Sequence, residues 1–157
     1  MNKISAVMHR SKYTKSAHPV FAIDGIPASS WIKGIVYNHL GEDTTDGLVP
    51  AQGWLIDEDH SRYAWQLLSP REEDSSTIVP LLICRDDMDL SCTVVVVEQV
   101  VCGSQLLWAR FGMATNEING FITSVLWSKS VQRAEFEKSQ FIDAYAEFKR
   151  LTEHVWT

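Results

Sequence analysis

Three aspartates lie close together in the segment Arg85-Asp86-Asp87-Met88-Asp89, directly after an apolar run. Clustered carboxylates are the ligands that hard cations such as Ca²⁺ prefer. A calcium loop between two helices would also need a glycine and a distal glutamate, and this segment has neither. Aspartate also bonds readily to its own backbone in turns. We therefore interpret the three aspartates as acids of a solvated turn, and we expect no metal ion.

Glu98 is an acid inside the apolar run of residues 92–102. If this run pairs with residues 105–113 in a hairpin, Glu98 lies opposite Ala109 on the core-facing side. Apolar surroundings raise the pKa of a carboxyl group, which would suit Glu98 to general acid or base catalysis. The alternative is that its side chain reaches water near the hairpin end, or that a one-residue bulge turns it outward.

The three cysteines, Cys84, Cys92 and Cys102, form no zinc motif, because seven and nine residues separate them and no C-x-x-C pair occurs. An odd number of cysteines is typical of a reducing compartment. We therefore expect the thiols to be buried and unreactive, and the protein to be cytoplasmic.

The sequence contains no G-x-S-x-G, H-E-x-x-H, P-loop or G-x-G-x-x-G signature. We therefore expect a protein without catalytic activity and without a cofactor. The alternative is a small hydrolase-like enzyme that uses Glu98, the Asp86–Asp89 cluster or a cysteine–histidine pair. The histidines that could complete such a pair are His18, His39 and His60.

Two helices are expected in the first half of the chain. One is capped by Ser29 or Ser30 and runs to about Leu40. The other begins after Asp57, whose carboxylate suits the N-cap position, and ends at Pro70.

Two apolar runs, residues 92–102 and 105–113, are separated by Gly103-Ser104, a pair that suits a type II′ turn. They predict an antiparallel hairpin with one core-facing side. The pairs expected on that side are Val94–Met113, Val96–Phe111 and Val100–Leu107. The other side, which is solvent-facing or a docking surface, carries Val95, Val97, Gln99, Trp108 and Arg110.

Residues 20–24, 78–84 and 121–128 predict further strands, and an amphipathic C-terminal helix begins near Lys138. Strands that are segregated from helices indicate the α+β class. We expect an antiparallel β-meander with helices packed on one face, folded as a single domain over residues 18–157. Residues 1–17 lack periodicity and are expected to form a flexible arm.

Charge is distributed unevenly along this chain of 157 residues, whose net charge is −6. The expected arm is basic, with Lys3, Arg10, Lys12 and Lys15, whereas residues 42–98 contain thirteen acids against three arginines. A negative field repels nucleic-acid phosphates and attracts cationic proteins, so we expect no direct nucleic-acid binding. The longest apolar run is far shorter than the roughly 20 residues of a membrane span, and we expect no secretory signal in the first ten residues.

Several stretches resemble bacterial immunity proteins of contact-dependent growth inhibition and other polymorphic toxin systems. They are residues 18–27, 47–51 with 53–55, 64–65, 80–84 with 91–98, and 108–110. The resemblance covers about residues 18–148 and assigns no functional residue. It implies a protein that neutralises a cognate toxin, such as a nuclease, by stoichiometric binding.

An acidic surface would suit a basic toxin domain, because complementary charge speeds association and penalises wrong partners. The residues expected at this surface are Asp57, Glu58, Asp59, Glu72, Glu73, Asp74, Asp86, Asp87 and Asp89, with Trp108 as an aromatic contact. A homo-oligomer that uses the Trp108 side of the hairpin is a third reading.

Overall fold

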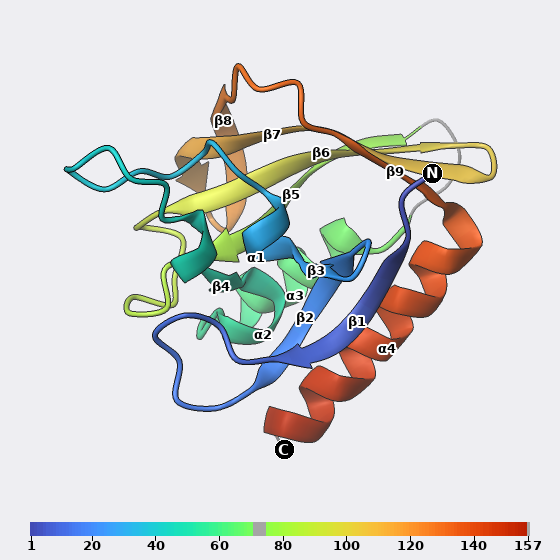
Figure 1. The fold of residues 1–157 in the computed structure, drawn as a ribbon, viewed down its shortest axis with the longest axis horizontal. Coiled ribbons are helices and arrows are strands. Elements are labelled where there is room, and N and C mark those ends of the chain that lie inside the picture. Colours follow the sequence, from blue (N-terminus) through green and yellow to red (C-terminus); the bar gives the residue numbers. More distant parts are fainter. Residues whose placement is uncertain (71–74, 157) are drawn as a thin grey trace.

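Two antiparallel sheets share one hydrophobic core in the computed structural model, which describes residues 1–70 and 75–156 (Figure 1). The larger sheet has the strand order β4 (Val49–Pro50), β5 (Ser75–Ile83), β6 (Val94–Cys102), β7 (Gln105–Ile118) and β8 (Phe121–Trp127). A short strand, β9 (Ala134–Glu137), pairs with the first part of β7, and β8 pairs with its second part.

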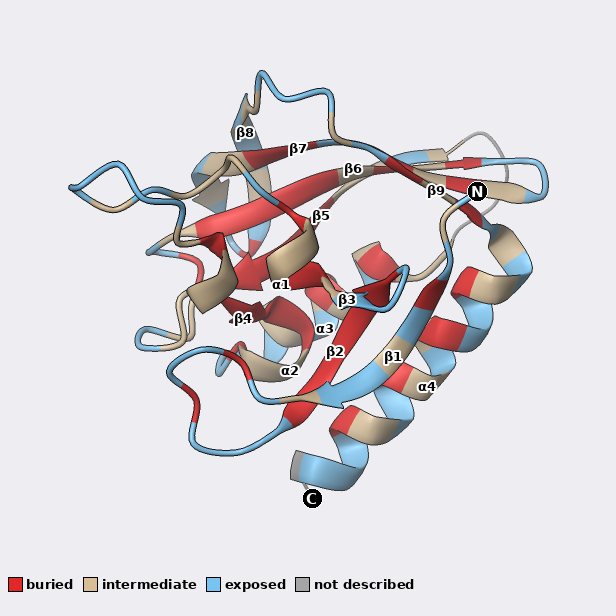
Figure 2. Cartoon of the chain, viewed as in Figure 1, coloured by how far each residue is buried: buried red, intermediate tan, exposed pale blue. Residues whose placement is uncertain are grey.

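The smaller sheet consists of β1 (Ile4–His9), β2 (His18–Ile23) and β3 (Ile26–Pro27). Helix α4 (Lys138–Trp156) begins at the predicted position and packs along β1 and β2. Its buried residues Phe141 and Phe148 contact Phe21 of β2, with ring centroids 5.8 and 4.6 Å apart. The molecule is therefore an α+β single domain with helices packed against antiparallel sheets, as predicted (Figure 2).

The N-terminal residues are not a loose arm. Ile4–His9 pairs with His18–Ile23 along its whole length, and the backbone N–H of Asn2 donates to the carbonyl of Glu135 at 2.8 Å. The prediction was wrong here because β1 is held by backbone pairing and by α4, while only Ile4 of its side chains is buried. Local apolar periodicity cannot reveal a strand of this kind.

Helix α3 (Glu58–Leu68) confirms the prediction of a helix capped by Asp57. The Asp57 carboxylate accepts hydrogen bonds from the backbone N–H groups of Asp59 and His60, at 2.9 and 3.0 Å. Two further helices are single turns: α1 (Ala28–Trp31) and α2 (Ala51–Trp54). A 3₁₀ turn, η1 (Thr45–Gly47), precedes β4.

The helix expected from Ser29 or Ser30 to Leu40 ends after one turn. The backbone N–H of Gly34 donates to Asp43 at 2.8 Å, and that of Val36 donates to Thr45 Oγ1 at 3.3 Å. Gly34 also has a φ of 78°, in the left-handed region that helices exclude. The side chains of Asp43 and Thr45 thus accept hydrogen bonds from the backbone N–H groups that a longer helix would use internally.

The β6–β7 hairpin has the predicted register only near its turn. Val100 pairs with Leu107 as expected, and Gly103 has the positive φ of 61° that the first residue of a type II′ turn requires. The register shifts between Glu98 and Gln99, so that Val96 pairs with Gly112 and not with Phe111. This bulge also overturns the predicted Val94–Met113 pair and moves Glu98 opposite Arg110.

No helix in the described part of the chain is long and apolar enough to span a membrane.

Candidate functional site

Two of the predicted acidic segments adjoin in the fold. One is the start of α3, and the other is the loop that connects β5 to β6. The backbone N–H of Ile56 donates to the carbonyl of Met88 at 3.1 Å, which ties the residue before the Asp57 cap to the middle of that loop. Six of the predicted acids are thereby gathered at one end of the sheet.

We call these six residues the acidic surface: Asp57, Glu58, Asp59, Asp86, Asp87 and Asp89. All are exposed except Asp89, which is half-buried. Among the described residues, Asp59 forms an ion pair with Arg62 at 2.8 Å and Asp86 forms one with Arg85 at 3.6 Å. Both arginines belong to the same two segments. Glu72, Glu73 and Asp74, which were also expected here, lie outside the described residues.

Local hydrogen bonds favour the charged form of two of these carboxylates. The pKa of Asp57 is lowered mainly because the backbone N–H of His60 donates to it. The pKa of Asp89 is lowered because the hydroxyl and the backbone N–H of Ser91 donate to its Oδ1, at 2.6 and 2.9 Å. Both carboxylates are therefore ionised at neutral pH, and the acidic surface carries negative charge.

Trp108 is not part of any surface. Its side chain is fully buried, and its Nε1 donates to Oε1 of Gln99 at 3.0 Å. Its ring packs edge-on against Phe136 and Phe141 in the core. The prediction that Trp108 contacts a partner is wrong, because the hairpin side that carries it faces the second sheet.

Glu98 is not held in apolar surroundings. Its carboxylate forms an ion pair with Arg110 at 3.3 Å and accepts a hydrogen bond from Ser76 Oγ at 3.3 Å. The Arg110 guanidinium in turn lies 3.9 Å from the centre of the Trp127 ring. A one-residue bulge, weighed as the alternative, is present; its extra residue is Ala109 of β7, and Glu98 pairs with Arg110.

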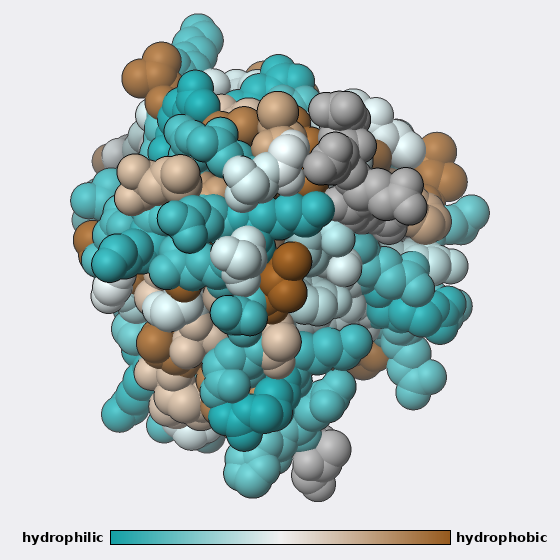
Figure 3. All heavy atoms as spheres, turned by 90° about the vertical axis from the view of Figure 1, so that its right-hand side faces the viewer, coloured by the Kyte–Doolittle hydropathy of each residue, from teal (hydrophilic) through white to brown (hydrophobic). Residues whose placement is uncertain are grey.

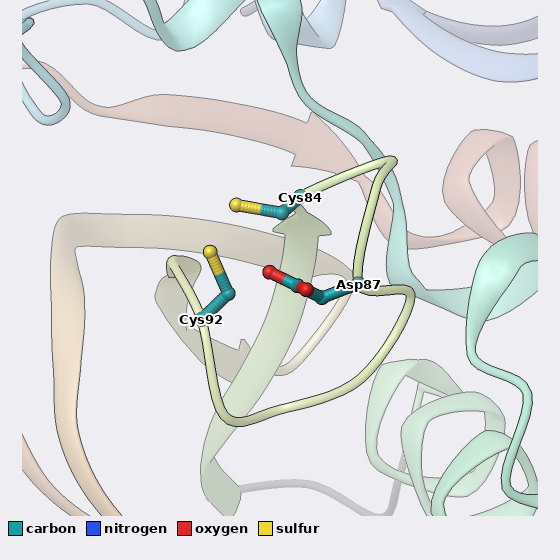
Figure 4. A group of neighbouring side chains, drawn as sticks. All are labelled: Cys84, Asp87 and Cys92. Atoms are coloured by element: carbon teal, nitrogen blue, oxygen red, sulfur yellow. The ribbon is translucent and has the colours of Figure 1, made fainter.

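The β5–β6 loop also brings two cysteines together with one of the aspartates. Cys84 follows β5, Cys92 lies two residues before β6, and Asp87 lies between them in the loop. Figure 4 shows the three side chains converging, and their sulfur and oxygen atoms all lie within 4.8 Å of one another. We call this group the thiol cluster.

The three cysteine thiols are not the buried groups that the sequence led us to expect. Cys92 and Cys102 are exposed, and Cys84 is half-buried. Hydrogen bonding to the Cys84 thiol, together with partial burial and the Asp87 carboxylate, raises the pKa of Cys92 to about 11. A neutral Cys92 thiol is a poor nucleophile.

Motif spacing did not reveal the thiol cluster, because seven residues separate Cys84 from Cys92. A usable signal was nevertheless present. The two cysteines flank the loop between two predicted strands, and the ends of neighbouring antiparallel strands meet in space. The pairing of Ile83 with Val94 brings them together in this way.

Comparison of the chain with protein-family models, with curated proteins and with solved structures gave no match. The fold and the site define an α+β domain that presents an acidic surface and a thiol cluster on one loop and the adjoining helix start.

Proposed function

We infer that this protein binds a basic protein domain, stoichiometrically, through the acidic surface. Following the resemblance of its sequence to immunity proteins, we propose that the partner is a bacterial toxin domain, such as a nuclease, and that binding occludes the toxin in the cytoplasm. The choice of a toxin rests on that resemblance alone. The choice of a basic partner rests on charge.

The observation that carries this proposal is the hydrogen bond between Ile56 and Met88, which joins two acidic segments about thirty residues apart in the chain. Charges that are close together act on an approaching partner as one field, and such fields can raise association rates by about 10- to 1,000-fold. Four of the six carboxylates have no ion-pair partner among the described residues. Their charge remains available to a cationic protein.

Hydrogen bonds from one buried side chain tie together the backbone beneath the acidic surface, which favours binding because less order must be gained. The buried amide of Gln52 in α2 donates to the carbonyls of Pro80 in β5, at 2.7 Å, and of Ala64 in α3, at 3.3 Å. Helix α3 is thus fixed to the strand from which the acidic loop emerges.

Charge reversal tests the proposal. The test variant is Glu58→Lys/Asp59→Lys/Asp86→Lys, which spares the Asp57 cap and the thiol cluster. The binding partner for the test is found by sequencing the genes beside that of this chain and expressing the C-terminal domain of a large secreted protein encoded there. We expect its association rate, measured by surface plasmon resonance, to fall by about 10- to 1,000-fold, with the loss shrinking as salt is added.

The control is Glu137→Lys/Asp143→Lys/Glu147→Lys on β9 and α4, which lie across the molecule from the acidic loop (Figure 1). That side is mainly hydrophilic, with scattered apolar side chains (Figure 3). The control makes the same change in net charge, places lysines near a helix start and removes the ion pair of Glu147 with Arg150. Equal binding by test and control variants would show that the acidic surface is not the binding site.

A further inference from the structure

We propose that Cys84, Asp87 and Cys92 bind one Zn²⁺ ion, with the fourth coordination position open to solvent. Zinc takes four ligands in tetrahedral geometry and favours thiolate sulfur, imidazole nitrogen and carboxylate oxygen. The thiol cluster offers two sulfurs and one oxygen within 4.8 Å of one another. This inference does not depend on the proposed function.

The separation of the three side chains fits a shared ion. Two sulfurs on one tetrahedral zinc lie about 3.8 Å apart, since each Zn–S bond is about 2.3 Å long. The present separations, at most 4.8 Å, would need to close by only about 1 Å. Rotation of an exposed Asp87 and an exposed Cys92 toward the half-buried Cys84 is enough.

The loop backbone is already folded around the cluster. The N–H of Met88 donates to the carbonyl of Cys84 at 3.1 Å, and Met88 has a φ of 53° that bends the chain back toward β6. The carbonyl of Met88 accepts the bond from Ile56, which anchors the loop to the start of α3. A site that is held before the metal arrives loses less entropy on binding.

The neighbouring carboxylates are engaged elsewhere, which singles out Asp87. Asp89 accepts two hydrogen bonds from Ser91, and Asp86 pairs with Arg85. Asp87 directs its carboxylate toward the two sulfurs (Figure 4).

The donor set selects a borderline-soft cation. Calcium requires six to eight oxygen ligands, and the cluster supplies a single carboxylate beside two sulfurs. Thiolate ligands favour zinc among the common divalent ions. Binding transfers one proton from each thiol to solvent, and the resulting complex of two thiolates, one carboxylate and Zn²⁺ carries a net charge of −1.

The experiment uses the full-length protein, reduced and freed of metal, without any partner. Zinc stoichiometry is measured by elemental analysis after gel filtration, and Co²⁺ serves as a spectroscopic probe whose sulfur-to-metal absorption reports thiolate ligation. We expect one ion per chain and such an absorption band. Zinc should also protect Cys84 and Cys92 from alkylation while Cys102, exposed at the hairpin turn, continues to react.

The matched variants separate ligands from neighbours. Mutation of a residue that only supports a metal ligand typically lowers metal affinity by about 10- to 100-fold. Cys84→Ser and Cys92→Ser remove ligands, so each should lower the affinity for zinc by more than that. Asp87→Asn should weaken binding at least about 10-fold. Cys102→Ser and Asp86→Asn should bind as the unaltered protein does. Circular dichroism confirms that each variant is folded.

Three results would overturn the proposal: no retained zinc, retention that survives Cys84→Ser and Cys92→Ser, or oxidation of the two thiols to a disulfide in the presence of zinc. None of them bears on toxin binding, because no partner is present in the experiment. Conversely, charge reversal at Glu58, Asp59 and Asp86 leaves all three ligands in place, so the two proposals fail independently.

Discussion

His18 is a buried titratable residue at the start of β2. Its Nε2 lies 2.8 Å from Ser11 Oγ, and its ring meets Trp54 edge-on at 5.2 Å. Burial lowers the pKa of His18. A hydrogen bond with the backbone of Ser16 acts in the opposite direction, and the charge of His9 lowers the pKa further. Because protonation is disfavoured in the folded state, the unfolded chain takes up the proton first as the pH falls.

The free energy of unfolding should therefore be steady above the ordinary histidine pKa of about 6.5 and should decrease as the pH falls below it. Urea denaturation between pH 7.5 and pH 5, in steps, measures this slope. His18→Gln should flatten it, whatever its effect on stability at neutral pH. His39→Gln, at an exposed loop position, should keep the original slope, and an equal flattening in both variants would contradict the assignment to His18.

At the scale of elements, the amide of Gln99 joins α3 to the sheet. This buried side chain donates to the carbonyl of Leu68 at 2.9 Å and accepts from the indole N–H of Trp108 at 3.0 Å. In Gln99→Leu, both partners would be left buried without a hydrogen bond. Each such group costs about 1–3 kcal/mol, so we expect the free energy of unfolding to fall by about 2–6 kcal/mol in urea denaturation.

A double-mutant cycle provides the control. In Gln99→Leu/Trp108→Phe, the indole N–H is gone, so the second substitution should cost less in the Gln99→Leu background than in the unaltered protein. Strictly additive effects would mean that the hydrogen bond between the two side chains contributes nothing.

Elements with a strong local signal were predictable. Asp57 before an amphipathic segment marked α3, Gly103-Ser104 marked the hairpin turn, and Lys138 marked the start of α4. The register shift between Glu98 and Gln99 could be weighed only as an alternative, because such a shift depends on how β7 packs against its other neighbours. Strand β1 was missed for a related reason: its stability comes from pairing with β2, which is a tertiary interaction.

At the scale of the whole molecule, the candidate site illustrates the same limit. The acidic residues were visible in the sequence, but their meeting depends on the packing of α3 against β5 and on the backbone hydrogen bond between Ile56 and Met88. The convergence of Cys84 with Cys92 depends on β5 and β6 being neighbours in the sheet. Trp108 lies in the β6–β7 hairpin, as predicted, but on the side that the second sheet covers. The spacing of apolar residues along the hairpin does not distinguish its two sides.

The second sheet itself leads to the last prediction, because β1 closes the core that both sheets share. Ile4 is buried in that core, and β1 contacts both β2 and α4. Deletion of residues 1–9 would remove Ile4, expose the edge of β2 and uncover part of α4. Loss of one buried isoleucine side chain alone costs about 2–5 kcal/mol, so we expect the deletion to lower the free energy of unfolding by at least about 3 kcal/mol. Thermal denaturation and analytical gel filtration measure the loss and any aggregation through the uncovered edge.

The matched control, Lys3→Ala/Lys12→Ala/Lys15→Ala, removes three exposed basic charges but keeps the strand, and it should remain about as stable as the unaltered protein. A flexible arm would give the opposite pattern, since its deletion would leave stability unchanged.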